Sequence, residues 1–206
     1  MKNMILIGYS GHAFVVADII LQQNCKLLGY MEKSVKAFNP LDLEYLGSEQ
    51  DKAAANFISE NRFVITIGDN LIRHKVYNLL EEYSSNAFNA IHPGATISSL
   101  AKIGNCITIM AGVHVNSLAV IGNGAILNTA AVIEHECNIG DFAHIGPSAT
   151  LAGNVKIGKN TFIGANSTIK EGIMIGDNVI VGAGSVVVKN VADNSVVYGN
   201  PAILRN

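Results

Sequence analysis

The chain has 206 residues and a formal net charge of −2, with no Lys/Arg cluster, which argues against nucleic acid or an anionic membrane as a partner. Hydrophobic residues make up 49% of the chain and charged residues only 15%, with no Trp, which suits a narrow, repetitive β-rich core better than a helical bundle. The N-terminal apolar run Met4–Ile7 is too short for a signal peptide or a membrane span. Cys25, Cys106 and Cys137 show no metal-ligand spacing, so we expect a reduced, cytoplasmic protein without a metal site.

Residues 1 to about 85 alternate short apolar runs with segments of helical periodicity. The predicted strands are Met4–Gly8, Lys26–Met31 and Phe63–Ile67, and the predicted helices are His12–Gln22 and Asn70–Tyr83. Strand–helix alternation predicts a small Rossmann-like α/β domain with a parallel sheet.

Candidate ligand contacts follow each of these strands. The segment Gly8–His12, which includes Ser10 and Gly11, connects the first strand to the first helix, and bare amides at a helix N-terminus suit a diphosphate. Glu32 ends the second strand about 20 residues later, where an acid can bind a ribose hydroxyl. The candidates after the third strand, for the other side of a nucleotide, are Gly68, Asp69, Asn70 and Arg73. Turn or helix-cap roles are the alternative for Asp69 and Asn70.

From Ile91 onward an aliphatic residue occupies every sixth position. The positions are Ile91, Ile97, Ile103, Ile109, Val115, Ile121, Leu127, Ile133, Ile139, Ile145, Leu151, Ile157, Ile163, Ile169, Ile175, Val181 and Val187. Three six-residue units make the sides of a triangular coil, and coils stack at about 4.8 Å. The pattern therefore predicts a parallel β-helix of about five coils. Its Asn and Gly residues supply the left-handed corner conformations.

The whole chain resembles bacterial nucleotide-sugar acetyltransferases that join an α/β domain to a left-handed β-helix. This group includes UDP-4-amino-sugar N-acetyltransferases of the bacillosamine type, perosamine N-acetyltransferases and sialic acid O-acetyltransferases. The motifs that carry the resemblance are GYSGHA (8–13), ITIGDNLIR (65–73), ILNTAAVIEHECNIGDFAHI (126–145), LAGNVKIG (151–158) and GNPA (199–202). The resemblance implies two domains: residues 1–85, which bind the nucleotide sugar, and residues 86–206, a β-helix acyltransferase domain with a C-terminal tail.

The resemblance places the general base at His135 and its orienting carboxylate at Glu136. An imidazole is suited to take a proton near neutral pH, and a carboxylate fixes its tautomer. His135 is at the third position of its hexapeptide, so it points outward; the alternative is an ordinary surface histidine. Gly153 lies eighteen residues after His135, one coil away in the same column. The unobstructed amide of Gly153 could donate to the thioester oxygen as that oxygen develops negative charge. The alternative is that Gly153 is only a turn glycine.

The remaining contacts depend on the resemblance. It implies acetyl-CoA as the acetyl donor, contacting His144, Gly153 and Ala165, and Asn128 is a candidate sugar contact. His144 is nine residues, half a coil, from His135. If both line one site, that site is assembled from two subunits, which agrees with the homotrimers of the family. A solvated edge histidine is the alternative for His144.

We therefore expect acetyl-CoA-dependent N-acetylation of an amino group on a nucleotide-linked sugar in bacterial glycan biosynthesis. The alternative is O-acetylation of sialic acid or another sugar hydroxyl. A zinc site of the γ-carbonic anhydrase type is disfavoured, because the spacing of His114, His135 and His144 does not match that family. A structural β-helix would show a regular outer threonine ladder, and the sequence has none.

Overall fold

A computed structural model describes residues 2–82 and 84–205 of the chain. The chain divides into two compact units, Met1–Pro93 and Gly94–Asn206, each with its own core. Within the described residues, no helix combines the length and the apolar character needed to cross a lipid bilayer.

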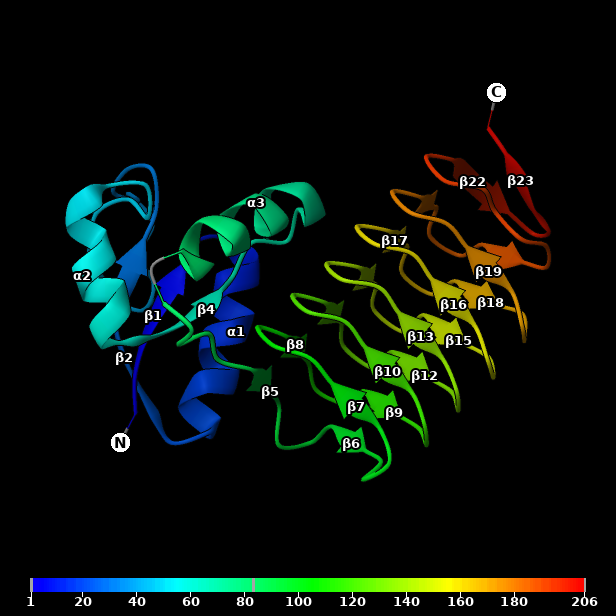
Figure 1. Ribbon diagram of the computed structural model, residues 1–206, viewed down its shortest axis with the longest axis horizontal. Helices are drawn as coiled ribbons and strands as arrows, with labels where there is room; N and C mark the ends of the chain where they lie inside the picture. Colours follow the sequence, from blue (N-terminus) through cyan, green and yellow to red (C-terminus); the bar gives the residue numbers. More distant parts are fainter. Residues whose placement is uncertain (1, 83, 206) are drawn as a thin grey trace. The chain divides into compact units, whose positions relative to one another are not determined.

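The first unit is built on a parallel sheet with strand order β3-β2-β1-β4 (Figure 1). In chain order its elements are β1 (Lys2–Ile7), α1 (Gly11–Gln22), β2 (Cys25–Met31), β3 (Glu44–Tyr45), α2 (Lys52–Glu60), β4 (Arg62–Ile65), α3 (Asn70–Glu81) and β5 (Ala90–Ile91). Met4–Ile7 of β1 is completely buried, as a central strand covered on both faces should be. The predicted α/β domain is confirmed.

The elements of this unit differ in detail from the prediction. β1 ends before Gly8, whose left-handed φ of +96° stops the strand, and α1 begins at Gly11. β4 ends at Ile65 and α3 at Glu81, while Tyr83 lies outside the described residues. β3 and α2 were not predicted from the sequence. β3 is only two residues long and too short to show a period, whereas α2 is amphipathic, so its signal was present in the sequence and was overlooked.

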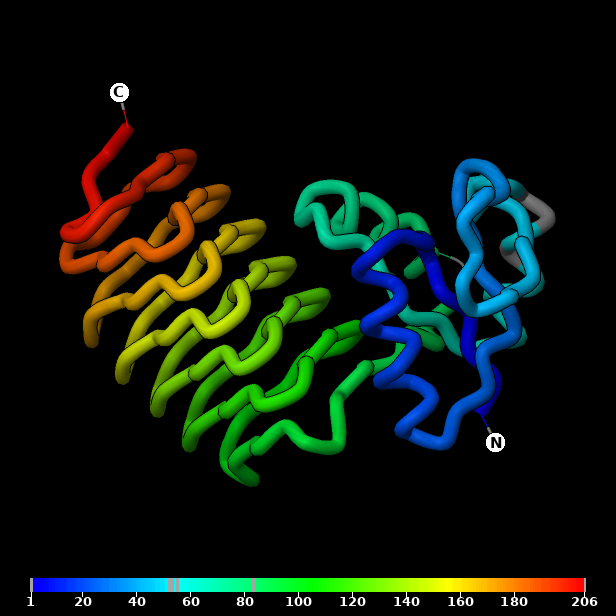
Figure 2. The backbone as a smooth tube through the Cα atoms, turned by 180° about the vertical axis from the view of Figure 1, so that it is seen from behind, coloured from blue at the N-terminus to red at the C-terminus, as the bar shows by residue number. Residues whose placement is uncertain are grey.

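The second unit is the predicted left-handed parallel β-helix, with two-residue strands stacked on three faces (Figures 1 and 2). One face holds β6 (Thr96–Ile97), β9 (His114–Val115), β12 (Val132–Ile133), β15 (Thr150–Leu151), β18 (Thr168–Ile169) and β21 (Val186–Val187). The next holds β7 (Lys102–Ile103), β10 (Val120–Ile121), β13 (Asn138–Ile139), β16 (Lys156–Ile157) and β19 (Met174–Ile175). The third runs through β8 (Thr108–Ile109), β11 (Ile126–Leu127), β14 (His144–Ile145), β17 (Phe162–Ile163), β20 (Ile180–Val181), β22 (Val196–Gly199) and β23 (Ala202–Leu204).

The coil length and the inward residues agree with the six-residue period. Ile121 pairs with Ile139, which in turn pairs with Ile157, so each coil takes eighteen residues. The aliphatic residue at the end of each short strand points into the prism; Ile133 and Ile145, for example, have no exposed surface. Corner residues adopt positive φ, at Asn as predicted but also at Glu136 (+61°). The regular core therefore fixes where each corner side chain is placed along the prism.

The eighteen-residue register ends after β21. Ile180 of β20 pairs with Val196 of β22, only sixteen residues later, and β22 then forms an antiparallel hairpin with β23. Gly199 and Ala202, the ends of the GNPA motif, face each other across the hairpin turn. The last coil is thus two residues shorter than the others and closes the prism.

Candidate active site

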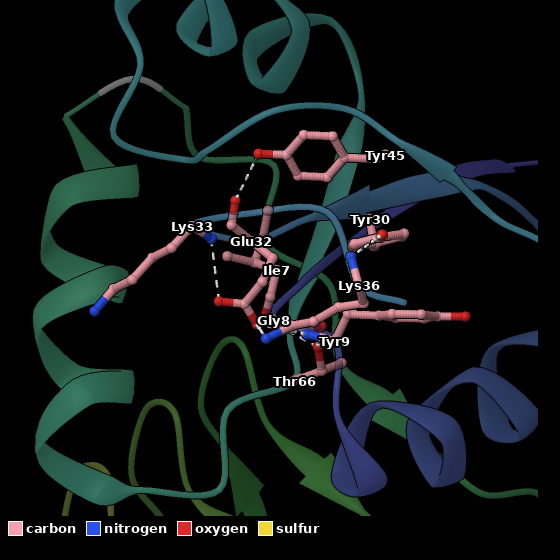
Figure 3. Close-up of polar contacts among 9 residues, drawn as sticks. All are labelled: Ile7, Gly8, Tyr9, Tyr30, Glu32, Lys33, Lys36, Tyr45 and Thr66. Atoms are coloured by element: carbon pink, nitrogen blue, oxygen red, sulfur yellow. Dashed lines mark hydrogen bonds and ion pairs between the residues drawn. The ribbon is translucent and has the colours of Figure 1, made fainter. Parts of the chain in front are cut away.

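The turn after β1 requires glycine at position 8. With φ at +96°, a Cβ on Gly8 would lie 2.7 Å from Cγ1 of Ile67. The Gly8 amide donates to the carbonyl oxygen of Met31 (2.9 Å), and the Thr66 hydroxyl donates to the Gly8 carbonyl (2.6 Å). Figure 3 shows Gly8 and Thr66 side by side at the centre of this network. The first turn is therefore held from both neighbouring strands.

A pocket of about 530 Å³ opens beside this turn, at the carboxyl ends of β1, β2 and β4. This edge is the usual ligand position in parallel α/β sheets. The residues proposed from the sequence that line it are Gly8, Ser10, Glu32, Gly68 and Asp69. The structure thus brings candidates from three separate loops to one cavity.

Four other candidates, Gly11, His12, Asn70 and Arg73, are not part of the pocket wall. His12 is largely buried near the start of α1, and burial, assisted by the positive charge of Arg73, lowers its pKa to about 4. His12 is therefore a neutral imidazole at physiological pH. It is not a cationic partner for phosphate in the free chain.

Arg73 holds the loop that follows β4. It is 1% exposed, and its Nη1 donates to the carbonyl oxygens of Ile67 (3.1 Å) and Gly68 (2.9 Å). Its Nη2 donates to Oδ1 of Asn70 (2.9 Å). Asp69 caps α3, because its Oδ1 accepts the Ile72 amide at 2.8 Å. These contacts shape the pocket wall formed by Gly68 and Asp69.

Glu32 is engaged by its own surroundings. Its Oε2 accepts the Tyr9 amide (3.2 Å) and lies 3.3 Å from Nζ of Lys36, while Oε1 accepts the Lys33 amide (3.1 Å) (Figure 3). Desolvation raises its pKa, but the two backbone hydrogen bonds and the Lys36 charge outweigh it, and the net pKa is lowered. Glu32 is thus an ionised carboxylate that ties the turn after β1 to the end of β2.

In the β-helix, His135 and Glu136 form a hydrogen-bonded pair at the corner after β12. Nδ1 of His135 and Oε2 of Glu136 are 3.1 Å apart, and both side chains are more than half exposed. Glu136 is a corner residue with positive φ. The Glu136 amide donates to the carbonyl of Ser117 one coil below (3.0 Å). A carboxylate on Nδ1 favours the tautomer that leaves Nε2 able to accept a proton.

Gly153 lies directly against the His135 ring, as the coil spacing predicts. A Cβ at Gly153 would be 2.6 Å from Nε2 of His135. The next residue, Asn154, donates its amide to the His135 carbonyl at 2.8 Å. The Gly153 amide donates to no residue within the described parts of the chain. A basic nitrogen and an open amide are therefore adjacent on one exposed corner.

Asn128 and His144, two separate candidates from the sequence, are hydrogen-bonded to each other. Nδ2 of Asn128 and Nε2 of His144 are 3.1 Å apart. His144 is only 9% exposed, and its ring meets the Phe162 ring edge-on, with centroids 5.0 Å apart. His144 belongs to β14, on a different face of the prism from β12, which precedes His135.

Ala165 occupies the corner between β17 and β18. Its carbonyl accepts the Gly184 amide from the coil above (2.8 Å). Its own amide makes no hydrogen bond with the residues that the structure describes. Gly146, one coil below, has no side chain to cover it; a Cβ there would lie 2.8 Å from the Ala165 nitrogen. Ala165 thus presents a second open amide.

Several pocket residues were not predicted from the sequence. They are Lys33, Glu49, Gln50, Thr66 and Lys75. Thr66 lies in the predicted strand Phe63–Ile67 and Lys75 in the predicted helix Asn70–Tyr83, so both could have been proposed from their positions after β4 and on α3. Glu49 and Gln50 follow the missed strand β3, and no motif marks them. Among residues 2–82 and 84–205, no group of three His, Cys, Asp or Glu side chains is arranged to hold a metal ion.

Comparisons with known protein families agree with this two-part organisation. Residues 3–80 match the PglD N-terminal domain family, and residues 154–189 match the hexapeptide repeat of succinyl-transferase. A UDP-N-acetylbacillosamine N-acetyltransferase from Bacillus subtilis is 32% identical over 113 residues, which cover 54% of this chain. The matched stretch spans about half (52%) of that curated relative.

Solved structures extend the similarity over the full chain. One is a histidine-to-asparagine variant of perosamine N-acetyltransferase from Caulobacter crescentus, in complex with CoA and GDP-perosamine. It has a TM-score of 0.93 and 32% identity over 100% of this chain and 98% of that chain. The acetyltransferase domain of PglB from Neisseria gonorrhoeae, in complex with acetyl coenzyme A, has a TM-score of 0.91 and 30% identity, with 99% of both chains covered.

Proposed function

The chain belongs to the acetyl-CoA-dependent, hexapeptide-repeat nucleotide-sugar acetyltransferases, and we propose that it acetylates an amino group on a nucleotide-linked amino sugar. The observation that carries the proposal is the corner where Nε2 of His135 faces the open amide of Gly153, with Glu136 on Nδ1. That arrangement combines a base, its orienting carboxylate and an amide donor, the groups that acyl transfer from a thioester needs.

In the proposed reaction the sugar amine attacks the thioester carbonyl carbon of acetyl-CoA. Nε2 of His135 takes the proton that the amine nitrogen loses, and Glu136 stabilises the resulting imidazolium through Nδ1–H. The Gly153 amide donates to the oxygen of the tetrahedral intermediate. When the intermediate collapses, the C–S bond breaks and the CoA thiolate receives the proton from His135. The products are the N-acetyl sugar and CoA.

We assign the donor to the β-helix. Acetyl-CoA would run along the prism past the open amides of Gly153 and Ala165, with His144 as a further contact. Because His144 already bonds Asn128 and is mostly buried, we propose that it acts through its exposed edge. Asn128 would then contact the acceptor sugar while its amide group stays oriented by His144.

The acceptor nucleotide is assigned to the first unit. Ser10 and Gly68 offer backbone amides at the 530 Å³ pocket, whose position at the strand carboxyl ends suits a nucleotide, while Gly8, whose amide already donates to Met31, shapes the turn beside it. The candidates that do not line the pocket are given indirect roles. Gly11 and His12 form the first turn of α1, and Arg73 with Asn70 fixes the loop after β4.

We further propose a cytoplasmic homotrimer with active sites at subunit interfaces. His135 and His144 lie at different faces of one prism, so a ligand that meets both would bridge neighbouring subunits. Light scattering on an active preparation tests this assembly. A monomeric mass would contradict it.

The activity is tested by thiol release from acetyl-CoA. The acceptor panel contains UDP-, GDP- and dTDP-linked amino sugars, and free sialic acid represents the hydroxyl alternative. We expect CoA release with at least one nucleotide-linked amino sugar and no release with the corresponding N-acetylated sugar. Release with sialic acid alone would replace N-acetylation by O-acetylation.

A further inference from the structure

The pocket of the first unit contains a carboxylate that pairs with no residue in the described parts of the chain. Glu49 is 5% exposed, and it lines the 530 Å³ pocket. Its carboxylate has no hydrogen bond or ion pair with any residue in the described parts of the chain. The Glu49 side chain is held in the pocket wall without a donor from the described chain, so its carboxylate oxygens are open to a ligand that brings hydrogen-bond donors.

The other two carboxylates of this pocket are already engaged. Glu32 accepts the amides of Tyr9 and Lys33 and pairs with Lys36, and Asp69 caps α3. Glu32 is the acid whose sequence position suggested ribose binding, but its oxygens are occupied by the chain itself. Glu49 is therefore the carboxylate of the pocket wall that is available to a ligand.

The backbone around Glu49 is firmly placed. Gly47 adopts φ of +92°, and its carbonyl accepts the Glu32 amide at 3.1 Å. The Tyr45 hydroxyl donates to the Glu32 carbonyl at 3.2 Å, as Figure 3 shows. Glu49 itself lies inside a turn closed by Ser48 and Asp51, with the Asp51 amide donating to the Ser48 carbonyl (3.0 Å). The backbone on both sides of Glu49 is thus held in place, with Gly47 bonded to the residue that follows β2, before any ligand arrives.

Two lysines on the same pocket balance its acids. Lys33 and Lys75 line the cavity, and neither ammonium group forms an ion pair with a described residue. In Figure 3 the Lys33 side chain extends away from Lys36, the lysine that pairs with Glu32. A ligand complementary to this pocket carries hydrogen-bond donors where it meets Glu49 and negative charge where it meets Lys33 and Lys75. A nucleoside diphosphate has both.

We propose that Glu49 is the specificity-determining residue for the nucleoside of the acceptor. Its carboxylate accepts hydrogen bonds from nucleoside donors, either the ribose hydroxyls or an N–H edge of the base, while Lys33 and Lys75 attract the diphosphate. The proposal rests on the proposed function, because it assigns the part of the nucleotide sugar that this pocket recognises.

The test is titration calorimetry on the full chain, without sugar or acetyl-CoA. The probes are GDP, UDP, their 2′-deoxy forms and inorganic pyrophosphate, and the variants are Glu49→Gln and the matched Glu44→Gln, at an exposed position of β3 outside the pocket. Glu49→Gln should weaken the preferred diphosphate about 10- to 100-fold and leave pyrophosphate unchanged. Glu44→Gln should bind like the wild type.

The pattern of losses identifies the group that Glu49 contacts. If the 2′-deoxy form already binds weakly and Glu49→Gln adds no further loss, the carboxylate holds the ribose. If instead the preference between GDP and UDP disappears in the variant, the carboxylate holds the base. Since Glu49 is unpaired in the free chain, Glu49→Gln should keep or raise the melting temperature, whereas a structural carboxylate would lower it.

Two results would overturn the inference: wild-type affinity for both diphosphates in a folded Glu49→Gln, or equal weakening of pyrophosphate. Failure of the proposed acetyltransferase function would give a different result from failure of the Glu49 proposal. A wild-type chain that binds a diphosphate through Glu49 but releases no CoA with any acceptor would refute the acetyltransferase substrate and leave the role of Glu49 intact.

Discussion

A methyl group on Gly153 would lie 2.6 Å from Nε2 of His135, so a side chain at position 153 would collide with the imidazole. The two residues are eighteen positions apart, one coil of the prism, and the regular stacking forces them together. Glycine at this position keeps both the ring nitrogen and the neighbouring amide accessible. The contact is therefore a direct consequence of the repeat.

The first prediction follows from this contact. Gly153→Ala should displace the His135 ring and lower turnover at least about 10²-fold, comparable to loss of an oxyanion donor or a positioned base. The exposed corner can relax, so we expect the melting temperature to change by only a few degrees. Steady-state kinetics and calorimetry on the same preparation measure both. Wild-type turnover in Gly153→Ala would show that the proximity has no catalytic use.

A second prediction concerns pH and His12. Burial first, and the Arg73 charge second, lower its folded pKa to about 4, below the ordinary value of 6.5. The unfolded chain therefore takes up this proton before the folded chain does, and stability is lost as pH falls from about 6.5 towards 4. The lost stability is about 3 kcal/mol. His12→Gln should be less sensitive than the wild type across this window.

Urea unfolding at pH 7 and pH 4.5 measures the difference. Above pH 7 both proteins should show the same pH dependence, because His12 is neutral in the folded and unfolded states. Parallel stability losses in the two proteins on acidification would contradict the buried, neutral state of His12.

A third prediction compares the stability contributed by the backbone amides that bind Glu32 with that contributed by its ion pair with Lys36. Glu32→Gln weakens two backbone hydrogen bonds to a charged acceptor and should cost about 1.5–3 kcal/mol. Lys36→Met removes only a partly exposed ion pair and should cost less than about 1 kcal/mol. Because the folded pKa of Glu32 is lowered, its contribution is present above the unfolded pKa and is lost as pH falls through the folded pKa. The gap between wild type and Glu32→Gln should therefore narrow in acid. An equal cost for both variants would contradict this division.

The β-helix and the corner that holds His135 and Gly153 could be predicted because their contacts repeat at a fixed sequence interval. Once Ile121, Ile139 and Ile157 are recognised as stacked, the positions of His135 and Gly153 follow by counting. The same counting could have paired Asn128 with His144, which lie sixteen residues apart on adjacent coils. The shortened last coil has no such signal, because β22 departs from the period.

Glu49 could not be predicted for a physical reason. Its place in the pocket depends on the bond from the Glu32 amide to the Gly47 carbonyl, and on the pairing of β3 with β2. A two-residue strand is too short to show the alternation that marks a strand in a sequence. Conversely, the suggestion of Glu32 as a ribose contact relied on its position after β2. It could not include the amides of Tyr9 and Lys33 that occupy its oxygens.

The last prediction tests the chemistry at His135. His135→Ala should lower turnover about 10²–10⁴-fold, the usual contribution of a positioned general base, while acetyl-CoA affinity changes little, because the base acts on the acceptor's proton. Glu136→Gln should lower turnover less than His135→Ala does, since Glu136 only orients and stabilises the imidazole through Nδ1.

Raising the pH should partly rescue His135→Ala if the acceptor is an amine, because the free amine becomes abundant without a base. A hydroxyl acceptor, whose pKa lies far above the accessible range, should show much weaker rescue. Single-turnover measurements across the pH range make the comparison, with His114→Ala as the control at an exposed histidine of β9. Wild-type single-turnover rates in His135→Ala at neutral pH would rule out His135 as the base.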